Sequence, residues 1–200
     1  MVPRFTGTLM VKQLSELSLS ELWELFPIIL KPHNPDYALW YEQEKQSLLK
    51  LLGSNNIARI NHIGSTAIPN LIAKPTIDIL LEINNTLLLA ELKELLFTDS
   101  WLLMSEDSED NRKPVFCKGY TASGFADKIF HLHIRPLGDW DELYFRDLLL
   151  EDEDVRVAYQ NSKLELLPKF KNNRDGYTQA KTDFIYNSTK LARQKYLNRY

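Results

Sequence analysis

The sequence predicts an α+β protein with a small mixed sheet, helices packed on one face of that sheet and an open polar cleft on the other. Two segments carry this prediction. Residues 76–83 alternate, with Ile77, Ile79 and Leu81 on one face and carboxylates on the other. Residues 128–135 repeat the design, with apolar side chains on one face and histidines on the other. Both strands therefore have one face suited to a core and one suited to chemistry.

The other elements follow from periodicity and from start and stop signals. Ser18 and Glu21 have the spacing of a capping box, which predicts a short helix over 18–26. An apolar stripe ending at Gly53 predicts a helix over 37–52. The remaining expected elements are a strand at 57–63, a helix at 86–97, a short strand at 101–104, a hairpin of 115–121 with 128–135, and helices near 140–150, 153–167 and 176–198.

Composition places the chain among ordinary globular proteins. Its 200 residues predict a single domain over 1–200, and 44% are apolar and 26% charged. A net charge of −3 gives no nucleic-acid signature. The single cysteine, Cys117, excludes an internal disulfide framework and fits a cytoplasmic location. No apolar run reaches the length of a membrane span, so we expect no membrane partner, and nothing in the sequence specifies an oligomeric state.

Residues 62–82 carry the first candidate site. Gly64 and Ser65 follow a predicted strand, where backbone N–H groups and a hydroxyl can bind phosphate oxygens. Lys74 adds a cation, and Pro69 and Pro75 restrict the loop. The alternative is a strand-ending turn in which Ser65 caps the segment that follows.

The motif HIGSTAIP…KP.IDIL, from His62 to Leu80, resembles the signature of the GrpB family, a branch of the nucleotidyltransferase superfamily. That superfamily has a Gly-Ser, about a dozen residues, and then a strand with spaced carboxylates; Ser65 and Asp78 match this spacing. Later GrpB-like blocks are FHLHI (130–134), FRDLL (145–149), AYQNSKLEL (158–166), and Tyr177 with Lys181. The resemblance covers roughly residues 32–198 and implies a nucleotidyltransferase-like fold, with 1–30 as a family-variable extension. Relatives that resemble this chain also occur fused to a coenzyme A biosynthesis kinase.

Asp78 is the residue that the resemblance assigns to a divalent ion bridging nucleotide phosphates. The chain departs from the pattern two residues later, where Leu80 stands in place of the second carboxylate. Glu82 lies on the same face, roughly 6 to 7 Å further along the strand. The alternative is that Asp78 pairs with Lys74 or a histidine to order the loop.

His131 and His133 project from one face of their strand and can share a metal ion. Asp78 or His62 would supply a third ligand, a donor set that suits Zn²⁺, Fe²⁺ or Mn²⁺ better than Mg²⁺. Contact with the substrate, acid–base work or a structural role are the alternatives. Arg135 adds an anion-binding side chain on the same face.

These predictions converge on one cleft. The expected catalytic residues are Asp78, Glu82, His131 and His133, and the expected metal ligands for Mg²⁺, Mn²⁺ or Zn²⁺ are Asp78, His131 and His133. The expected substrate-binding residues are His62, Gly64, Ser65, Thr66, Lys74, Arg135 and Lys181. Basic residues of the later blocks, Arg146, Lys163 and Lys181, are candidates for an anion site.

The predicted function is binding of a nucleotide or phosphorylated small molecule with a divalent metal, and the resemblance implies transfer of a nucleotidyl group. Two alternatives remain open. One is a non-catalytic, anion- or nucleotide-binding accessory module, which the missing carboxylate at Leu80 favours. The other is a metal-dependent hydrolase that uses the histidines and Asp78.

Overall fold

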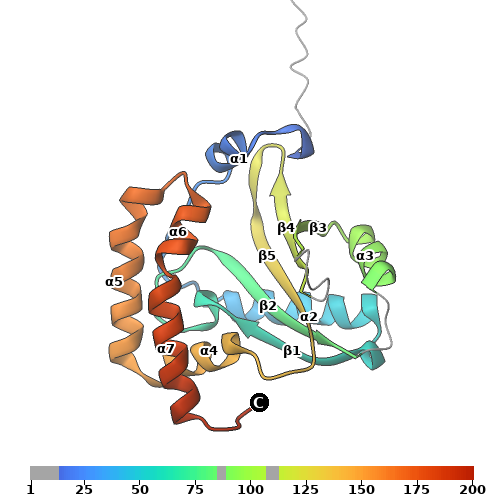
Figure 1. Ribbon diagram of the computed structural model, residues 1–200. Helices are drawn as coiled ribbons and strands as arrows, with labels where there is room; N and C mark the ends of the chain where they lie inside the picture. The colour runs from blue at the N-terminus through green and yellow to red at the C-terminus, as the bar shows by residue number, and fades with distance from the viewer. Residues whose placement is uncertain (1–13, 85–88, 107–112) are drawn as a thin grey trace, which may run out of the picture.

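A computed structural model describes residues 14–84, 89–106 and 113–200. Its centre is a five-stranded mixed sheet (Figure 1). The strands lie in the order β1 (Ile57–Ile63), β2 (Thr76–Ile83), β5 (Gly124–Pro136), β4 (Val115–Thr121) and β3 (Leu102–Ser105). β2 and β5 are parallel, and the other neighbouring pairs are antiparallel. The α+β class and the mixed sheet are as predicted, and β5 begins at Gly124, earlier than expected, because the hairpin turn is tight.

Seven helices surround the sheet within the described residues. They are α1 (Leu19–Leu25), α2 (Tyr37–Leu52), α3 (Leu89–Thr98), α4 (Asp141–Glu151), α5 (Glu153–Phe170), α6 (Arg174–Ala180) and α7 (Thr182–Lys195). The capping box predicted for α1 is present, because Ser18 and Glu21 bond reciprocally. The predicted start of α3 lies outside the described residues. No helix in the described part of the chain combines the length and apolarity that a membrane span requires.

The main core lies between the sheet and helices α2 and α3. Alternate residues of β2 and β5 point into it and are buried there, as their sequence pattern predicted. Leu48 of α2, Leu92 of α3 and the loop residue Trp101 pack against them, each with no exposed surface. This apolar layer fixes the opposite faces of β2 and β5 toward helices α4 to α7.

Helices cover part of that opposite face as well, so the expectation of helices on one face alone was wrong. Leu143 of α4 packs against Leu80 of β2 and Ile63 of β1. Figure 1 shows α4 to α7 on the side of the sheet away from α3. Helix α4 therefore covers the polar face at Leu80, and a cavity remains on the same face beside Asp78.

The C-terminal segment forms two helices, where a single helix over 176–198 was expected. Asn173 caps α6 by accepting a hydrogen bond from the Gly176 N–H at 2.8 Å, and α6 ends at Ala180. Lys181 lies between α6 and α7. This break places Lys181 beside the hollow.

Candidate functional site

A cavity of about 730 Å³ lies between the polar face of the sheet and helices α4 to α7. Its volume falls within the range of small-molecule sites. The sheet side contributes Ile63, Gly64, Ser65, Lys74, Asp78, His133 and Arg135, and the helical side contributes Phe145, Tyr159, Lys163, Tyr177, Lys181, Ile185 and Thr189 among others. Seven of the residues predicted to form the site therefore line one cavity: Gly64, Ser65, Lys74, Asp78, His133, Arg135 and Lys181.

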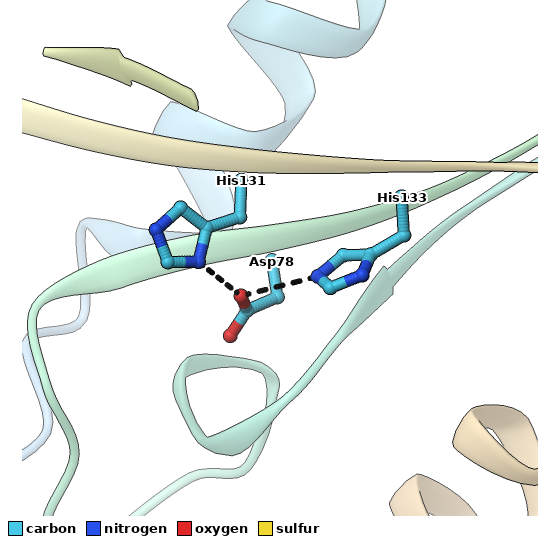
Figure 2. Close-up of side chains that lie close together, drawn as sticks. All are labelled: Asp78, His131 and His133. Carbon is cyan, nitrogen blue, oxygen red and sulfur yellow. Dashed lines mark hydrogen bonds and ion pairs between the residues drawn. The ribbon is translucent and has the colours of Figure 1, made fainter. Parts of the chain in front are cut away.

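Asp78 contacts both histidines, of which His133 lines the cavity and His131 is buried and does not line it. Parallel pairing puts Asp78 opposite His131 and Leu80 opposite His133, which confirms that the two strands are neighbours with their polar side chains on one face. Asp78 Oδ1 lies 3.1 Å from His131 Nδ1 and 3.6 Å from His133 Nε2. Figure 2 shows the carboxylate between the two rings. Pairing of Asp78 with a histidine was one of the two alternatives expected for it.

The environment of Asp78 keeps its carboxylate ionised. Burial alone would raise the pKa of this carboxyl group. The hydrogen bonds from His131 and His133 outweigh burial and hold the pKa well below its ordinary value. Asp78 is therefore a fixed negative charge at the wall of the cavity.

His131 is held from its other side by residues that the sequence did not suggest. Tyr120 Oη lies 2.9 Å from His131 Nε2, and the Arg174 guanidinium donates to Tyr120 Oη at 2.8 Å. Burial lowers the pKa of His131, and the neighbouring Asp78 only partly offsets this effect. His131 thus has a partner at each ring nitrogen, Asp78 at Nδ1 and Tyr120 at Nε2.

Two features of the structure favour glycine at position 64: the backbone conformation there and the close approach of the Asp78 side chain. Its φ is +70°, in the region that favours glycine. A Cβ added there would lie 2.3 Å from Asp78 Oδ2. The glycine therefore permits close approach of the Asp78 carboxylate to the turn, and Ser65 follows at the start of the short helix η3 (Ser65–Ala67).

Three lysines gather at the same end of the cavity. Lys163 is 2% exposed, and its Nζ donates to Ser65 Oγ at 3.2 Å and to the Ile72 carbonyl oxygen. Burial lowers the pKa of Lys163 to about 7, and repulsion from Lys181 and Lys74 adds to this shift. The pKa of Lys181 is also lowered to about 7 by burial and by Lys74. Burial lowers the pKa of Lys74 too.

No carboxylate among the described residues forms an ion pair with any of the three lysines. Asp78 is the acidic group that favours the charged forms of Lys74 and Lys181. The hydroxyl of Tyr177, which is buried beside these lysines, has no hydrogen-bond partner within the described part of the chain. One buried and two half-buried lysines, together with an unsatisfied hydroxyl, form a site suited to an anion.

Comparison with known proteins identifies the family. The sequence model described as "GrpB protein" matches residues 27–191. The chain belongs to the GrpB family.

Relatives and a solved structure agree with this assignment. The Bacillus subtilis UPF0157 protein YqkA is 29% identical over 181 residues, which are 89% of this chain and 51% of that protein. The Alkalihalophilus pseudofirmus glutamate-rich protein GrpB is 29% identical over 161 residues, 79% of this chain and 91% of that one. The crystal structure of a conserved GrpB protein from Enterococcus faecalis superposes with a TM-score of 0.70 at 27% identity, covering 84% of this chain and 99% of the other. This chain thus spans about half the length of YqkA, and none of these names states an activity.

Two residues expected in the cleft of this GrpB protein lie elsewhere. Ile63, and not His62, pairs opposite Asp78, so His62 projects to the α2 face. There it stacks on Tyr41 at 4.8 Å, and burial lowers its pKa to about 4. His62 Nε2 lies 3.0 Å from Thr66 Oγ1, and buried Thr66 donates to the Thr76 carbonyl oxygen. Both residues fix the loop and do not line the cavity.

Glu82 also lies outside the site. It has no exposed surface, and its carboxylate receives hydrogen bonds from the Arg59 guanidinium and from the Gly138 N–H at 3.1 Å. The expectation that Glu82 supplements Asp78 was wrong, because the strand carries it beyond Leu80 into a buried ion pair. Asp78 is therefore the only carboxylate that the described residues of β2 supply to the cavity.

The basic candidates divide into two groups. Arg135 lines the cavity, with its Nη2 3.6 Å from Glu142 Oε1. Arg146 instead bonds Asp147, Asn61 and the His62 carbonyl oxygen, so it supports the loop and not an anion site. Lys163 and Lys181, the other two basic candidates from the GrpB-like blocks, line the cavity.

The sequence reasoning missed Tyr120 and Arg174. The β4 register shifts between Lys118 and Tyr120, where Gly119 has a φ of +90°, so simple alternation does not place Tyr120. For Tyr120, the neighbouring Gly119 was the sequence feature that could have indicated the irregular strand. No sequence feature pointed to Arg174, because its role depends on where α6 begins.

Proposed function

We propose that this GrpB protein binds a nucleotide or a phosphorylated small molecule in the cavity, together with a divalent cation at Asp78. The observation that carries the proposal is the set of three lysines, Lys74, Lys163 and Lys181. They come from both sides of the cavity, meet at one end of it, here called the lysine wall, and have no carboxylate partners among the described residues. Phosphate oxygens supply the negative charge that this wall lacks, and they accept hydrogen bonds from ammonium groups.

The phosphate end of the ligand is placed by neighbouring groups. Lys163 Nζ donates a hydrogen bond to Ser65 Oγ, so the ammonium group and the hydroxyl lie next to each other and can contact the same phosphate. Tyr177 offers a further buried hydroxyl donor. Apolar and aromatic side chains, among them Phe145 and Tyr159, form walls suited to the rest of the ligand.

The donor set at Asp78 fits a cation. The ligand atoms of Asp78, His131 and His133 lie within 4.8 Å of one another. Tetrahedral coordination with bonds of about 2.1 Å needs ligand atoms about 3.4 Å apart, so small side-chain movements suffice. A bound cation would neutralise phosphate charge and polarise a phosphorus–oxygen bond. A carboxylate combined with histidine nitrogen favours Zn²⁺, Mn²⁺ or Fe²⁺ over Mg²⁺.

The activity attached to this binding depends on the number of carboxylates. Nucleotidyl transfer, which the superfamily resemblance implies, ordinarily uses two or three carboxylates to hold hard cations. Here Leu80 is buried under Leu143, and Glu82 is bound to Arg59. This arrangement favours a binding module without nucleotidyl transfer over the transferase. The histidines make a metal-dependent hydrolase the second candidate.

Thermal unfolding of the metal-stripped protein tests the proposal. We would screen Mg²⁺, Mn²⁺ and Zn²⁺ with and without nucleoside triphosphates. A ligand present at a hundred times its Kd stabilises by about 2.7 kcal/mol, which corresponds to a rise of roughly 5 to 10 °C for 200 residues. Asp78→Asn should remove the metal-dependent part of the rise, whereas the exposed Asp127→Asn should not. No rise with any combination would refute the proposal.

A metal-dependent turnover assay then separates the alternatives. Release of pyrophosphate from a nucleoside triphosphate, lost in Asp78→Asn, would support nucleotidyl transfer. Release of inorganic phosphate from a phosphate ester with Zn²⁺ or Mn²⁺, lost in His133→Gln, would support the hydrolase. Binding without either product would support the accessory module.

A further inference from the structure

The two histidines that meet Asp78 have different surroundings. His133 lines the cavity, and its contact with a charged partner is the one to Asp78. His131 is only 8% exposed and is held on its far side by Tyr120, whose ring stacks on it at 5.9 Å and 24°. A shared strand face therefore does not imply a shared role.

The donors and acceptors around His131 fix the position of its hydrogen. The guanidinium of Arg174 has only donors, so it donates to Tyr120 Oη. The hydroxyl hydrogen of Tyr120 is then directed to His131 Nε2 as its acceptor. A neutral imidazole that accepts at Nε2 carries its hydrogen on Nδ1, and that N–H donates to Asp78 Oδ1.

We propose that Tyr120, held by Arg174, positions His131 as a hydrogen-bond donor to Asp78, so that His131 orients this carboxylate while Asp78 and His133 are left to hold the cation. The part that concerns the cation rests on the proposed function, whereas the arrangement of the His131 ring does not. Tyr120 and Arg174 are positioning residues.

The opposite arrangement has a specific cost. A cation bound at His131 Nδ1 requires the ring hydrogen on Nε2, which would point at Tyr120 Oη. Tyr120 Oη would then receive hydrogens from both His131 and Arg174, and its own hydrogen would lose its acceptor. An unsatisfied hydroxyl in this half-buried position is unfavourable. The contacts of Tyr120 thus favour His131 as an outer partner of the cation site, a role in which such residues tune metal affinity.

Arg174 also connects this arrangement to the rest of the cavity. It is the first residue of α6, the helix that carries Tyr177 and leads into Lys181. The bond from Arg174 to Tyr120 therefore joins the lysine end of the cavity to the Asp78 end. Loss of Arg174 would remove the donor that directs the hydroxyl hydrogen of Tyr120 to His131.

Nitrogen-15 NMR of the histidine rings in the metal-free protein tests the ring arrangement. We expect His131 to carry its hydrogen on Nδ1 in the wild-type protein. Tyr120→Phe should leave the hydrogen on Nδ1, because the ionised Asp78 still accepts it, but should shift the Nε2 resonance toward that of a ring nitrogen without a hydrogen bond. Arg174→Leu should shift the Nε2 resonance in the same direction by a smaller amount. Tyr196→Phe, which removes a remote hydroxyl bonded to Glu151, is the control and should change nothing. Hydrogen on Nε2 in the wild-type protein, or no change in Tyr120→Phe, would overturn the inference.

Competition with a chelator for Zn²⁺ or Mn²⁺ tests the division of roles. Tyr120→Phe should weaken binding roughly tenfold, in the range for residues that orient a ligand, and His133→Gln should weaken it more than a hundredfold. Equal losses in His131→Gln and His133→Gln would overturn the assignment of His131. Failure of the wild-type protein to bind either metal would instead refute the cation site of the proposed function, and the NMR result would remain interpretable.

Discussion

Ligand binding at the lysine wall should be coupled to proton uptake. Lys163 and Lys181 each have a pKa lowered from 10.5 to about 7, in both cases mainly by burial. At pH 8 a group with a pKa of about 7 is about nine-tenths deprotonated. A bound phosphate chain brings negative charge beside both ammonium groups and raises both pKa values. We therefore expect an uptake of between about one and two protons for each polyphosphate bound at pH 8.

The same shifts determine how the stability of the ligand-free protein depends on pH. Below pH 7 the folded and unfolded chains both carry these protons, and between pH 7 and 10.5 the unfolded chain alone retains them. Stability therefore rises with pH across this window, by about 1.4 kcal/mol per pH unit for each lysine. Lys163→Met should remove the contribution of Lys163, and it should stabilise the ligand-free protein near pH 7 because a poorly solvated cation is lost.

Isothermal titration calorimetry measures the uptake directly. Pyrophosphate or a nucleoside triphosphate would be titrated at pH 8 in buffers with different ionisation enthalpies. The slope of the observed enthalpy against the buffer enthalpy gives the number of protons. Lys163→Met should lower this number by about one, whereas the exposed Lys190→Met should leave it unchanged. Proton release on binding, or an uptake unaffected by Lys163→Met, would refute the reasoning.

Two further predictions concern residues that shape the site. Arg59→Met leaves the buried Glu82 carboxylate without its partner guanidinium, so the free energy of unfolding should fall by about 3 to 5 kcal/mol. Binding of a divalent cation at Asp78 should persist. A loss of stability below about 1 kcal/mol, measured by calorimetry, would contradict the buried ion pair. Gly64→Ala should abolish cation binding because its Cβ would overlap Asp78 Oδ2. Gly53→Ala, at a similar φ of +80° but with its nearest neighbour 3.5 Å away, should cost only about 1 kcal/mol of stability; equal cation binding by both glycine variants would contradict the close approach.

Periodicity predicted the parts of the fold that local patterns control. The alternation of residues 76–83 and 128–135 correctly placed Asp78, His131 and His133 on one face, because side-chain direction in a strand depends only on parity. Asn70 has a φ of 62°, a left-handed conformation that asparagine tolerates better than most other residues. These features need no knowledge of distant contacts.

The same patterns could not predict the strand register or the packing of the helices. His62 was placed wrongly because Gly64 begins a turn, so a shared parity with Gly64 did not mean a shared face with Asp78. Glu82 has the right parity, but Arg59 of the neighbouring strand pairs with it. Both errors arise from tertiary contacts between β1 and β2, which spacing within one strand does not encode.

The lysine wall is the feature that depends most on the fold. Lys74 comes from a loop, Lys163 from α5, and Lys181 from the junction of α6 and α7. The GrpB-like blocks indicated that the last two belong to the family pattern, but only the packing of the C-terminal helices over the sheet brings the three together. Mutual repulsion and burial then produce the lowered pKa values.

The binding of a nucleoside triphosphate to the double variant Lys163→Met/Lys181→Met tests the central claim most directly. Hydrogen bonds to charged groups contribute about 1.5 to 3 kcal/mol each, so loss of both should raise the Kd at least about a hundredfold. The matched variant Lys190→Met/Lys195→Met, at exposed positions, should bind as the wild-type protein does. Equal affinity of the wild-type protein and the Lys163/Lys181 variant would contradict the account.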